Sequence, residues 1–212
     1  RAYIVSSMES LHFIDMSNHA VPVIKGKLDH QSISILHPFD DGNSLVIGGI
    51  DRKSAELSQL QISLFNTTDL GNPILLSNYS VDRASSSQIE YNLHASHFLP
   101  SSQKLILPTS IKVQKVSSGF DGFTIFDVFQ ENISTSFNIS HIDPIKIETT
   151  CCKDNYLTPR ILVKESIVTT IKGHTILAYD LNTKEKLWEL NLDKNNADCF
   201  DGGYWCDSLT LE

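Results

Sequence analysis

The sequence predicts an all-β fold of the β-propeller type, built from four-stranded antiparallel blades. A short strand rich in β-branched and aromatic residues occurs four times and each time ends in Asp or Asn. The four copies are spaced at roughly 50–60 residues, a period typical of propellers and solenoids. No stretch of useful length between them has the 3.6-residue apolar period of a helix, which disfavours a parallel sheet with crossover helices.

The recurring strand has an apolar strand before it and another after it. Its four copies are Leu11–Asp15, Gln61–Asn66, Gly122–Asp127 and Thr175–Asp180. The strands expected before them are Tyr3–Ser6, Leu45–Gly48, Lys104–Leu107 and Ser166–Thr170. Those expected after them are Val21–Leu28, Pro73–Val81, Ile133–Ser140 and Glu185–Leu192.

A leading strand completes the last three units, at Ser32–Phe39, Ala95–Pro100 and Arg160–Val163. The first unit lacks one, so we expect about three and three-quarter blades. The expected boundaries are 1–28 for the partial blade and 30–81, 93–142 and 159–192 for the full ones, followed by a tail over 193–212. The chain starts at Arg1 without Met, as if cut from something longer, and we expect it to be part of a longer propeller.

The residue that ends each recurring strand is expected to have a structural role. Asp and Asn side chains accept hydrogen bonds from the backbone two residues further on and so stabilise turns. We therefore interpret Asp15, Asn66, Asp127 and Asp180 as blade-turn residues and predict no catalytic residue among them.

Three segments resemble a known family. They are Leu36–Gly49 with its LHPFDDGNSLVIGG run, Gln61–Asp69 followed by Asn72-Pro73, and Gly122–Val128 with GFTIFDV. In this order they are similar to segments of secreted proteins with a C-terminal β-propeller domain, distantly related to WD-40 repeats. The resemblance covers roughly residues 1–192. It implies export and further blades upstream of Arg1, and it implies no particular reaction.

Cysteines and glycosylation sequons indicate an oxidising compartment. Four cysteines occur, all in the C-terminal third, and four Asn-x-Ser/Thr sequons occur with them. An even number of cysteines combined with several sequons favours an extracellular or cell-surface protein. The cysteines are Cys151, Cys152, Cys199 and Cys206, and the candidate glycosylation sites are Asn66, Asn78, Asn132 and Asn138. Four cysteines allow three pairings, and we expect at least one bridge to hold the tail against the Cys151-Cys152 region.

Charge and hydropathy exclude two classes of partner. With 17 Lys+Arg and 25 Asp+Glu the formal charge is −8, which argues against a nucleic-acid binder. Hydrophobic residues make up 41% of the chain, but no apolar run reaches the ~18 residues that a membrane helix needs.

Cofactor signals are weak. His94 and His97 are three positions apart and would point to opposite faces of a strand, so a shared metal is not expected. Carboxylate and amide oxygens in the tail offer a calcium alternative, with Asp193, Asn195, Asp198 and Asp201 as candidate ligands. The segment Ala178–Trp188 resembles the tryptophan-docking repeat of quinoprotein propellers, but it occurs once instead of in every blade.

The expected function is therefore a non-enzymatic structural or interaction module of an extracellular glycoprotein. Strands at both ends of the blade series leave unpaired backbone groups, which favours a homo-oligomer or a filament. The segment 203–211 is one candidate for the missing leading strand. The alternative is a propeller enzyme or a carbohydrate-binding domain that uses the central channel.

Overall fold

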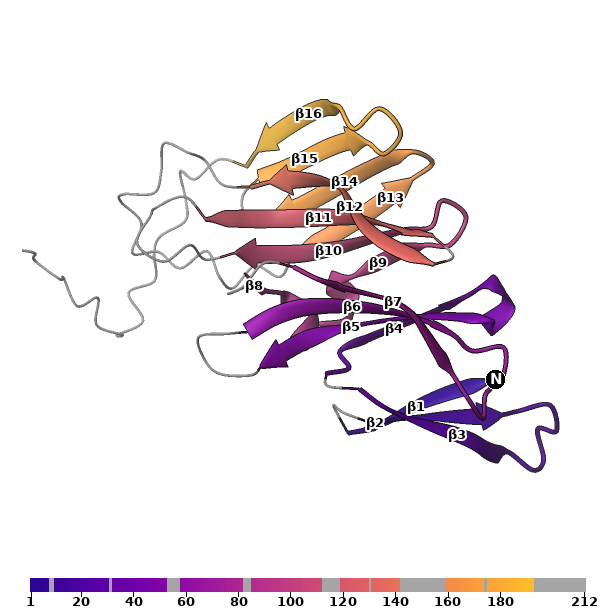
Figure 1. The fold of residues 1–212 in the computed structure, drawn as a ribbon. Helices are drawn as coiled ribbons and strands as arrows, with labels where there is room; N and C mark the ends of the chain where they lie inside the picture. The colour runs from indigo at the N-terminus through magenta and orange to yellow at the C-terminus, as the bar shows by residue number, and fades with distance from the viewer. Residues whose placement is uncertain are drawn as a thin grey trace, which may run out of the picture.

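The chain folds into four antiparallel sheets that follow one another in chain order. The computed structural model describes residues 1–7, 10–30, 32–52, 58–81, 85–111, 119–129, 131–141, 159–173 and 175–192. The sheets lie side by side as a fan of twisted blades, from the first blade at the bottom of Figure 1 to the fourth at the top. The predicted all-β class and the four repeats are confirmed.

The strands agree closely with the expected ones. The first blade contains β1 (Ala2–Ser7), β2 (Ser10–Asp15) and β3 (Val23–Asp29). The second contains β4 (Ile35–Phe39), β5 (Ser44–Arg52), β6 (Ser58–Asn66) and β7 (Ile74–Ser80). The third contains β8 (Ser85–Ser86), β9 (His97–Leu99), β10 (Lys104–Ile111), β11 (Phe120–Phe129) and β12 (Asn132–Ser140). The fourth contains β13 (Arg160–Lys164), β14 (Ile167–Lys172), β15 (Thr175–Asp180) and β16 (Lys186–Asn191).

The described part of the first blade has three strands, in the order β1-β2-β3, without a leading strand beside β1. In the third blade the expected leading strand is shorter, and β8 pairs with the other end of β10. Two short 3-10 helices, η2 (Gln88–Glu90) and η3 (Leu93–Ala95), connect β8 to β9. No helix in the described ranges is long and apolar enough to cross a membrane.

A β-bulge recurs at the same place in every blade. The register between the recurring strand and the strand after it shifts just before the last two residues of the recurring strand, at Phe13/Ile14, Leu64/Phe65, Ile125/Phe126 and Ala178/Tyr179. Bulges increase the local twist of a strand. The shared bulge also aligns the blades residue by residue, so that Gly26, Ser77, Phe137 and Trp188 occupy one equivalent position and Leu28, Tyr79, Ile139 and Leu190 another.

The apolar core consists of three layers, one at each junction between neighbouring blades. Leu11, Phe13, Leu45 and Phe65 belong to the layer between the first and second blades. The second layer joins Val46, Ile62 and Leu64 to Leu105, Leu107 and Phe126. The third joins Phe123, Ile125 and Ile139 to Val168 and Leu177. Both faces of the two middle blades are therefore buried, which accounts for their nearly continuous apolar strands.

Outer strands contribute to these junctions. Tyr79 of β7 meets Phe126 with ring centroids 5.6 Å apart, and its hydroxyl group is 2.9 Å from Thr135 Oγ1 on β12. At the next junction Phe137 of β12 meets Tyr179, the counterpart of Phe126, with ring centroids 6.1 Å apart. Such aromatic pairs add about 0.5–1.5 kcal/mol each to the free energy gained by burial.

Candidate functional site

Each blade has two ends with different chemistry. The adjoining ends of β1 and β2, of β5 and β6, of β10 and β11 and of β14 and β15 lie at one end of the blades. The last strand of each blade also ends there, and we call it the crossover end. The blade-turn residues lie toward the other end, which we call the turn end.

Three of the four blade-turn residues hold turns at the turn end. Asp15 Oδ1 accepts a hydrogen bond from the Ser17 amide at 2.9 Å, and Asn66 Oδ1 accepts one from Thr68 at 2.9 Å. Asp180 Oδ1 accepts two, from Asn182 and Thr183, at 2.7 and 3.0 Å. These backbone donors lower the pKa of the Asp15 and Asp180 carboxyl groups.

Asp127 differs from the other three. It lies inside β11, which continues to Phe129, so no turn follows it directly. Its carboxylate accepts a charged hydrogen bond from Lys104 Nζ at 2.5 Å, directly across the β10–β11 pair. The sequence did not reveal the pairing of Asp127 with Lys104, because β11 extends two residues past the Asp that ends the recurring motif.

The sequons lie on the outer rim of the middle blades. Asn78 on β7 and Asn132 and Asn138 on β12 are exposed. Asn78 Oδ1 accepts a hydrogen bond from Ser63 Oγ at 3.2 Å, which leaves its amide nitrogen for modification. Asn66 is only half-exposed and its side chain is engaged in the turn described above.

Several expected residues lie outside the described residues. They are the four cysteines Cys151, Cys152, Cys199 and Cys206, the calcium candidates Asp193, Asn195, Asp198 and Asp201, and the whole tail over 193–212. The part of the chain that is described contains no group of three or more His, Cys, Asp or Glu side chains placed to hold a metal ion.

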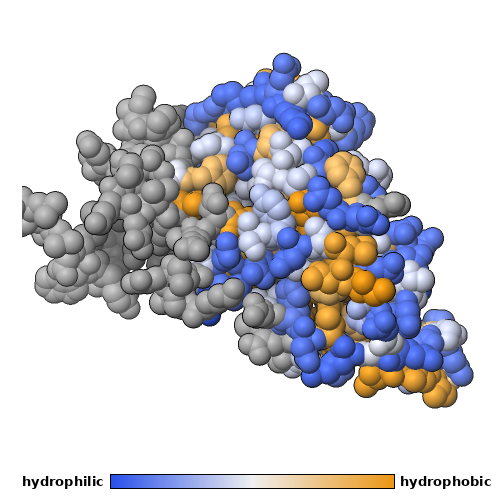
Figure 2. Space-filling model, in the orientation of Figure 1, coloured by the Kyte–Doolittle hydropathy of each residue, from blue (hydrophilic) through white to orange (hydrophobic). Residues whose placement is uncertain are grey.

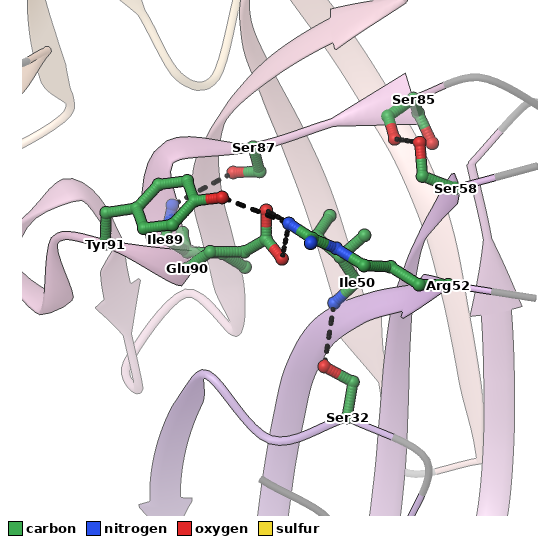
Figure 3. A network of polar contacts seen from close by, with 9 residues as sticks. All are labelled: Ser32, Ile50, Arg52, Ser58, Ser85, Ser87, Ile89, Glu90 and Tyr91. Atoms are coloured by element: carbon green, nitrogen blue, oxygen red, sulfur yellow. Dashed lines mark hydrogen bonds and ion pairs between the residues drawn. The ribbon is translucent and has the colours of Figure 1, made fainter. Parts of the chain in front are cut away.

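A polar network at the crossover end was not expected from the sequence (Figure 3). Arg52 Nη2, at the end of β5, donates to both carboxylate oxygens of Glu90 at 2.9 and 3.1 Å. The same nitrogen donates to the Tyr91 hydroxyl at 3.0 Å. Tyr91 is 81% exposed, so its ring faces solvent beside the ion pair.

The segment that carries Glu90 and Tyr91 is anchored by buried serines. Ser85 Oγ accepts a hydrogen bond from the Leu60 amide at 2.8 Å, and Ser87 Oγ donates to the Pro108 carbonyl. Ile89, fully buried, packs in the core layer between the second and third blades. The network therefore occupies a fixed position at the junction of these blades. No charge pattern in the sequence indicated it, because Arg52 and Glu90 are 38 residues apart.

Histidines also lie at the blade junctions. His30 Nε2 is 2.9 Å from Ser63 Oγ, and His141 Nε2 is 2.9 Å from Thr170 Oγ1 in the next blade. His37 Nε2 is 3.2 Å from Ser96 Oγ, and its ring stacks on Phe98. Burial lowers the pKa of His37 and of His141 to about 4, so both are neutral at physiological pH. These side chains form contacts between neighbouring blades.

A family model described as the beta propeller domain matches residues 1–184. The chain belongs to this β-propeller domain family. Since the match covers nearly the whole described chain, it confirms the propeller part of the resemblance that we drew from the three sequence segments. A search of the curated proteins finds none that matches.

Solved structures agree on the fold of this β-propeller domain. It is similar to a candidate 6-phosphogluconolactonase from Bacteroides uniformis, with 15% identity and a TM-score of 0.51, over 88% of this chain and 50% of that one. It is also similar to the WD40 domain of SCAP from fission yeast, with 12% identity and a TM-score of 0.39, over 88% and 38% of the two chains. The domain thus spans half the length of the first of these proteins.

The first and fourth blades of the β-propeller domain each present one outward apolar face. The cross-strand register places Leu162 and Trp188 on one face of the fourth blade, with Ile176 and Leu190 beside them. Trp188 is 47% and Leu190 51% exposed, and every residue of β16 is exposed. The internal junctions bury apolar side chains at the corresponding positions.

The outward face of the first blade also carries exposed apolar side chains. Ile4 on β1 and Ile24 on β3 are exposed and flank Ile14 on β2, which is half-buried. Figure 2 shows hydrophobic side chains gathered over the end of the molecule formed by β3, where Val23 is exposed as well.

Proposed function

We propose that this β-propeller domain is a non-enzymatic interaction module of an extracellular glycoprotein assembly. The observation that carries the proposal is the outward face of the fourth blade. Leu162, Trp188 and Leu190 lie there in the register that buries apolar side chains at the internal junctions, yet they are exposed. Exposed apolar surface of this kind marks sites of protein–protein contact.

The placement of the sequons supports an extracellular setting. Asn78, Asn132 and Asn138 are exposed on outer strands, where an N-linked glycan can be attached. Glycans at these three positions would leave both outward faces accessible, since all three lie on the second and third blades.

The polar groups at the crossover end support a structural role in place of catalysis. Arg52 is paired with Glu90, and Lys172 is paired with Asp121, which also accepts a hydrogen bond from Ser110. The junction histidines bind hydroxyl groups of neighbouring strands. Side chains that already form ion pairs or hydrogen bonds within the protein stabilise the blades and are less available to a substrate.

Hydroxyl-radical footprinting tests the proposed role. We expect Trp188 and Leu162 to be protected in material isolated from the producing cells and to be reactive in the isolated chain diluted until it is monomeric. Phe129, 52% exposed on the third blade, is the matched control and should react equally in both samples. Equal reactivity of Trp188 in both samples would exclude the interaction role of this face.

A second candidate function is carbohydrate binding at the Arg52–Glu90–Tyr91 network. An exposed aromatic ring beside charged hydrogen-bonding groups can stack on a sugar ring and bind its hydroxyl groups. A glycan array probed with the wild-type chain and with Tyr91→Ala tests this function. Tyr91-dependent binding supports it, and binding that survives the substitution contradicts it.

A further inference from the structure

We infer that N-linked glycans at Asn78 and Asn138 shield the outer edges of β7 and β12 from pairing with a strand of another copy. The inference rests on the extracellular setting in the proposed function, and it assigns a role to two of the four sequons. Asn78 and Asn138 lie on the strands that end the second and third sheets, and both residues are exposed.

The last strand of every blade lies at the edge of its sheet. In the described ranges β3, β7, β12 and β16 each pair with one strand only, the recurring strand of the same blade. The outer edge of such a strand presents backbone N–H and C=O groups that can pair with a strand of another molecule. Charged side chains on an edge strand are one of the ways in which natural sheets prevent this pairing.

The outer strands of the two middle blades carry no charge. β3 contains Lys25, Lys27 and Asp29, and β16 contains Lys186 and Glu189. By contrast, no charged residue occurs in β7 (ILLSNYS) or in β12 (NISTSFNIS). Uncharged segments that form strands and contain neither Pro nor Gly are prone to pair edge to edge and aggregate. The two strands without charge are the two outer strands that contain sequons.

The sequons also lie at the position that is charged in the other blades. The shared bulge aligns one position of the outer strand across the four blades, occupied by Lys27, Asn78, Asn138 and Glu189. The residue is exposed in all four. This position therefore holds a charged residue in the first and fourth blades and a sequon asparagine in the second and third.

A glycan at this position can replace the charge. An N-linked glycan is bulky and polar, so on an edge strand it obstructs the approach of another strand. Asn78 is held at the edge of β7 by the hydrogen bond of its Oδ1 with Ser63 Oγ, which leaves the amide nitrogen for the glycan. The other two sequons do not lie at the aligned position, since Asn66 ends β6 and Asn132 begins β12.

Removing both glycans tests the inference. In the full chain secreted by a glycosylating host, Ser80→Ala combined with Asn138→Gln removes both sequons and keeps the Asn78 side chain. Size-exclusion chromatography over time measures the remaining soluble protein. We expect soluble protein to be lost roughly tenfold faster than for the wild type, as for a barrier lowered by about 1.4 kcal/mol.

The third-blade sequon Asn132 provides the matched control. Asn132→Gln removes a glycan from the same strand but away from the aligned position, so it should aggregate at the wild-type rate. Equally fast aggregation of this variant and of the double variant would contradict a role of the strand position, because any glycan would then serve.

Charged substitutions separate edge protection from other effects of glycans. Asn78→Lys combined with Asn138→Glu removes both sequons but introduces the residue types of the first and fourth blades, and it should aggregate at the wild-type rate. This variant also loses the hydrogen bond between Ser63 and Asn78. In urea it should be no more stable than the glycan-free double variant, so its slower aggregation would not reflect higher stability.

Three further outcomes would overturn the inference. They are a wild type that stays soluble although Asn78 and Asn138 are bare, a glycan-free double variant that stays soluble as long as the wild type, and a charged variant that aggregates as fast as the glycan-free one. The interaction role of the fourth-blade face is measured separately, by the protection of Trp188, so it stands or fails independently of these results.

Discussion

Histidine side chains at the blade junctions are the residues most sensitive to acid. His37 stacks on Phe98 between the second and third blades, and His141 contacts Phe123 with ring centroids 5.4 Å apart between the third and fourth. Among the described residues, the Nδ1 atom of His141 has no hydrogen-bond partner although it is buried. An imidazole held in this way resists protonation, because the charged form would lose solvation.

Mild acid should therefore destabilise the domain. The pKa values of His37 and His141 fall from the ordinary 6.5 to about 4 in the folded state. The unfolded chain then binds protons that the folded chain does not bind as the pH falls from 6.5 to 4, so the free energy of unfolding decreases over this range. The loss is about 1.4 kcal/mol per pKa unit for each histidine.

Urea unfolding at a series of pH values measures this loss. His141→Gln should flatten the pH dependence of the free energy of unfolding, whereas the same substitution at His19, which is exposed, should not change it. A wild-type free energy of unfolding that stays constant between pH 6.5 and 4 would contradict the assignment.

The accessibility of the sequons gives a second prediction at this scale. In material from a secreting host we expect glycans at Asn132, Asn138 or Asn78, which are exposed, and lower occupancy at Asn66, whose side-chain oxygen holds a turn. Peptide mapping with and without enzymatic deglycosylation measures the occupancy of each site. If all three exposed sites are bare while Asn66 is occupied, accessibility does not control modification here.

The turn after β15 shows what the recurring Asp contributes to an element. Asp180 Oδ1 binds two backbone amides and its Oδ2 accepts a hydrogen bond from Ser166 Oγ at 2.8 Å. Asp180→Ala should lower Tm by roughly 2–4 °C. Asp180→Asn should lower it less, because Asn66 holds the equivalent turn of the second blade. Differential scanning calorimetry compares them, and equal losses would contradict a role for the side-chain oxygen.

The strands could be predicted because each blade repeats one local signal. A β-branched and aromatic strand that ends in Asp or Asn is recognisable in any single copy, and the fourfold repetition fixed the order of the neighbouring strands. The segment from Ser85 to Ala95 was not predicted, because its two short 3-10 helices depend on buried contacts of Ser85, Ser87 and Ile89 with distant strands. The role of Asp127 in an ion pair, in place of the predicted turn, was also not predicted, because its partner Lys104 belongs to another strand.

A single glycine allows the first two blades to approach closely. A Cβ atom on Gly26 of β3 would lie 2.2 Å from the Leu70 carbonyl oxygen in the loop after β6. Gly26→Ala should therefore force the blades apart and cost about 1–3 kcal/mol of the free energy of unfolding. At Gly71 the nearest atom is a side-chain oxygen at 3.2 Å, so Gly71→Ala is the milder control in the same urea experiment. Equal stability of the two variants would rule out close packing at Gly26.

At the scale of the whole molecule, each blade is stabilised mainly by its neighbours. The three core layers lie between blades, so a blade at the end of the series has only one of its two faces covered. The sequence predicted the number of blades, since this follows from counting repeats. The sequence did not predict the outward faces, because Trp188 and Leu190 read as ordinary strand residues until the shared bulge aligns them with Phe137 and Tyr79.

If the proposed assembly forms between copies of this chain, thermal stability should depend on protein concentration. A partner that binds only the folded state raises its stability by mass action. We therefore expect Tm of the wild-type chain to rise with concentration, and Tm of Trp188→Glu to be lower and nearly constant. Differential scanning fluorimetry over a hundredfold range of concentration measures both, with Phe129→Glu as the control that should follow the wild type. If the wild-type Tm is also independent of concentration, other copies of the chain do not cover the outward faces.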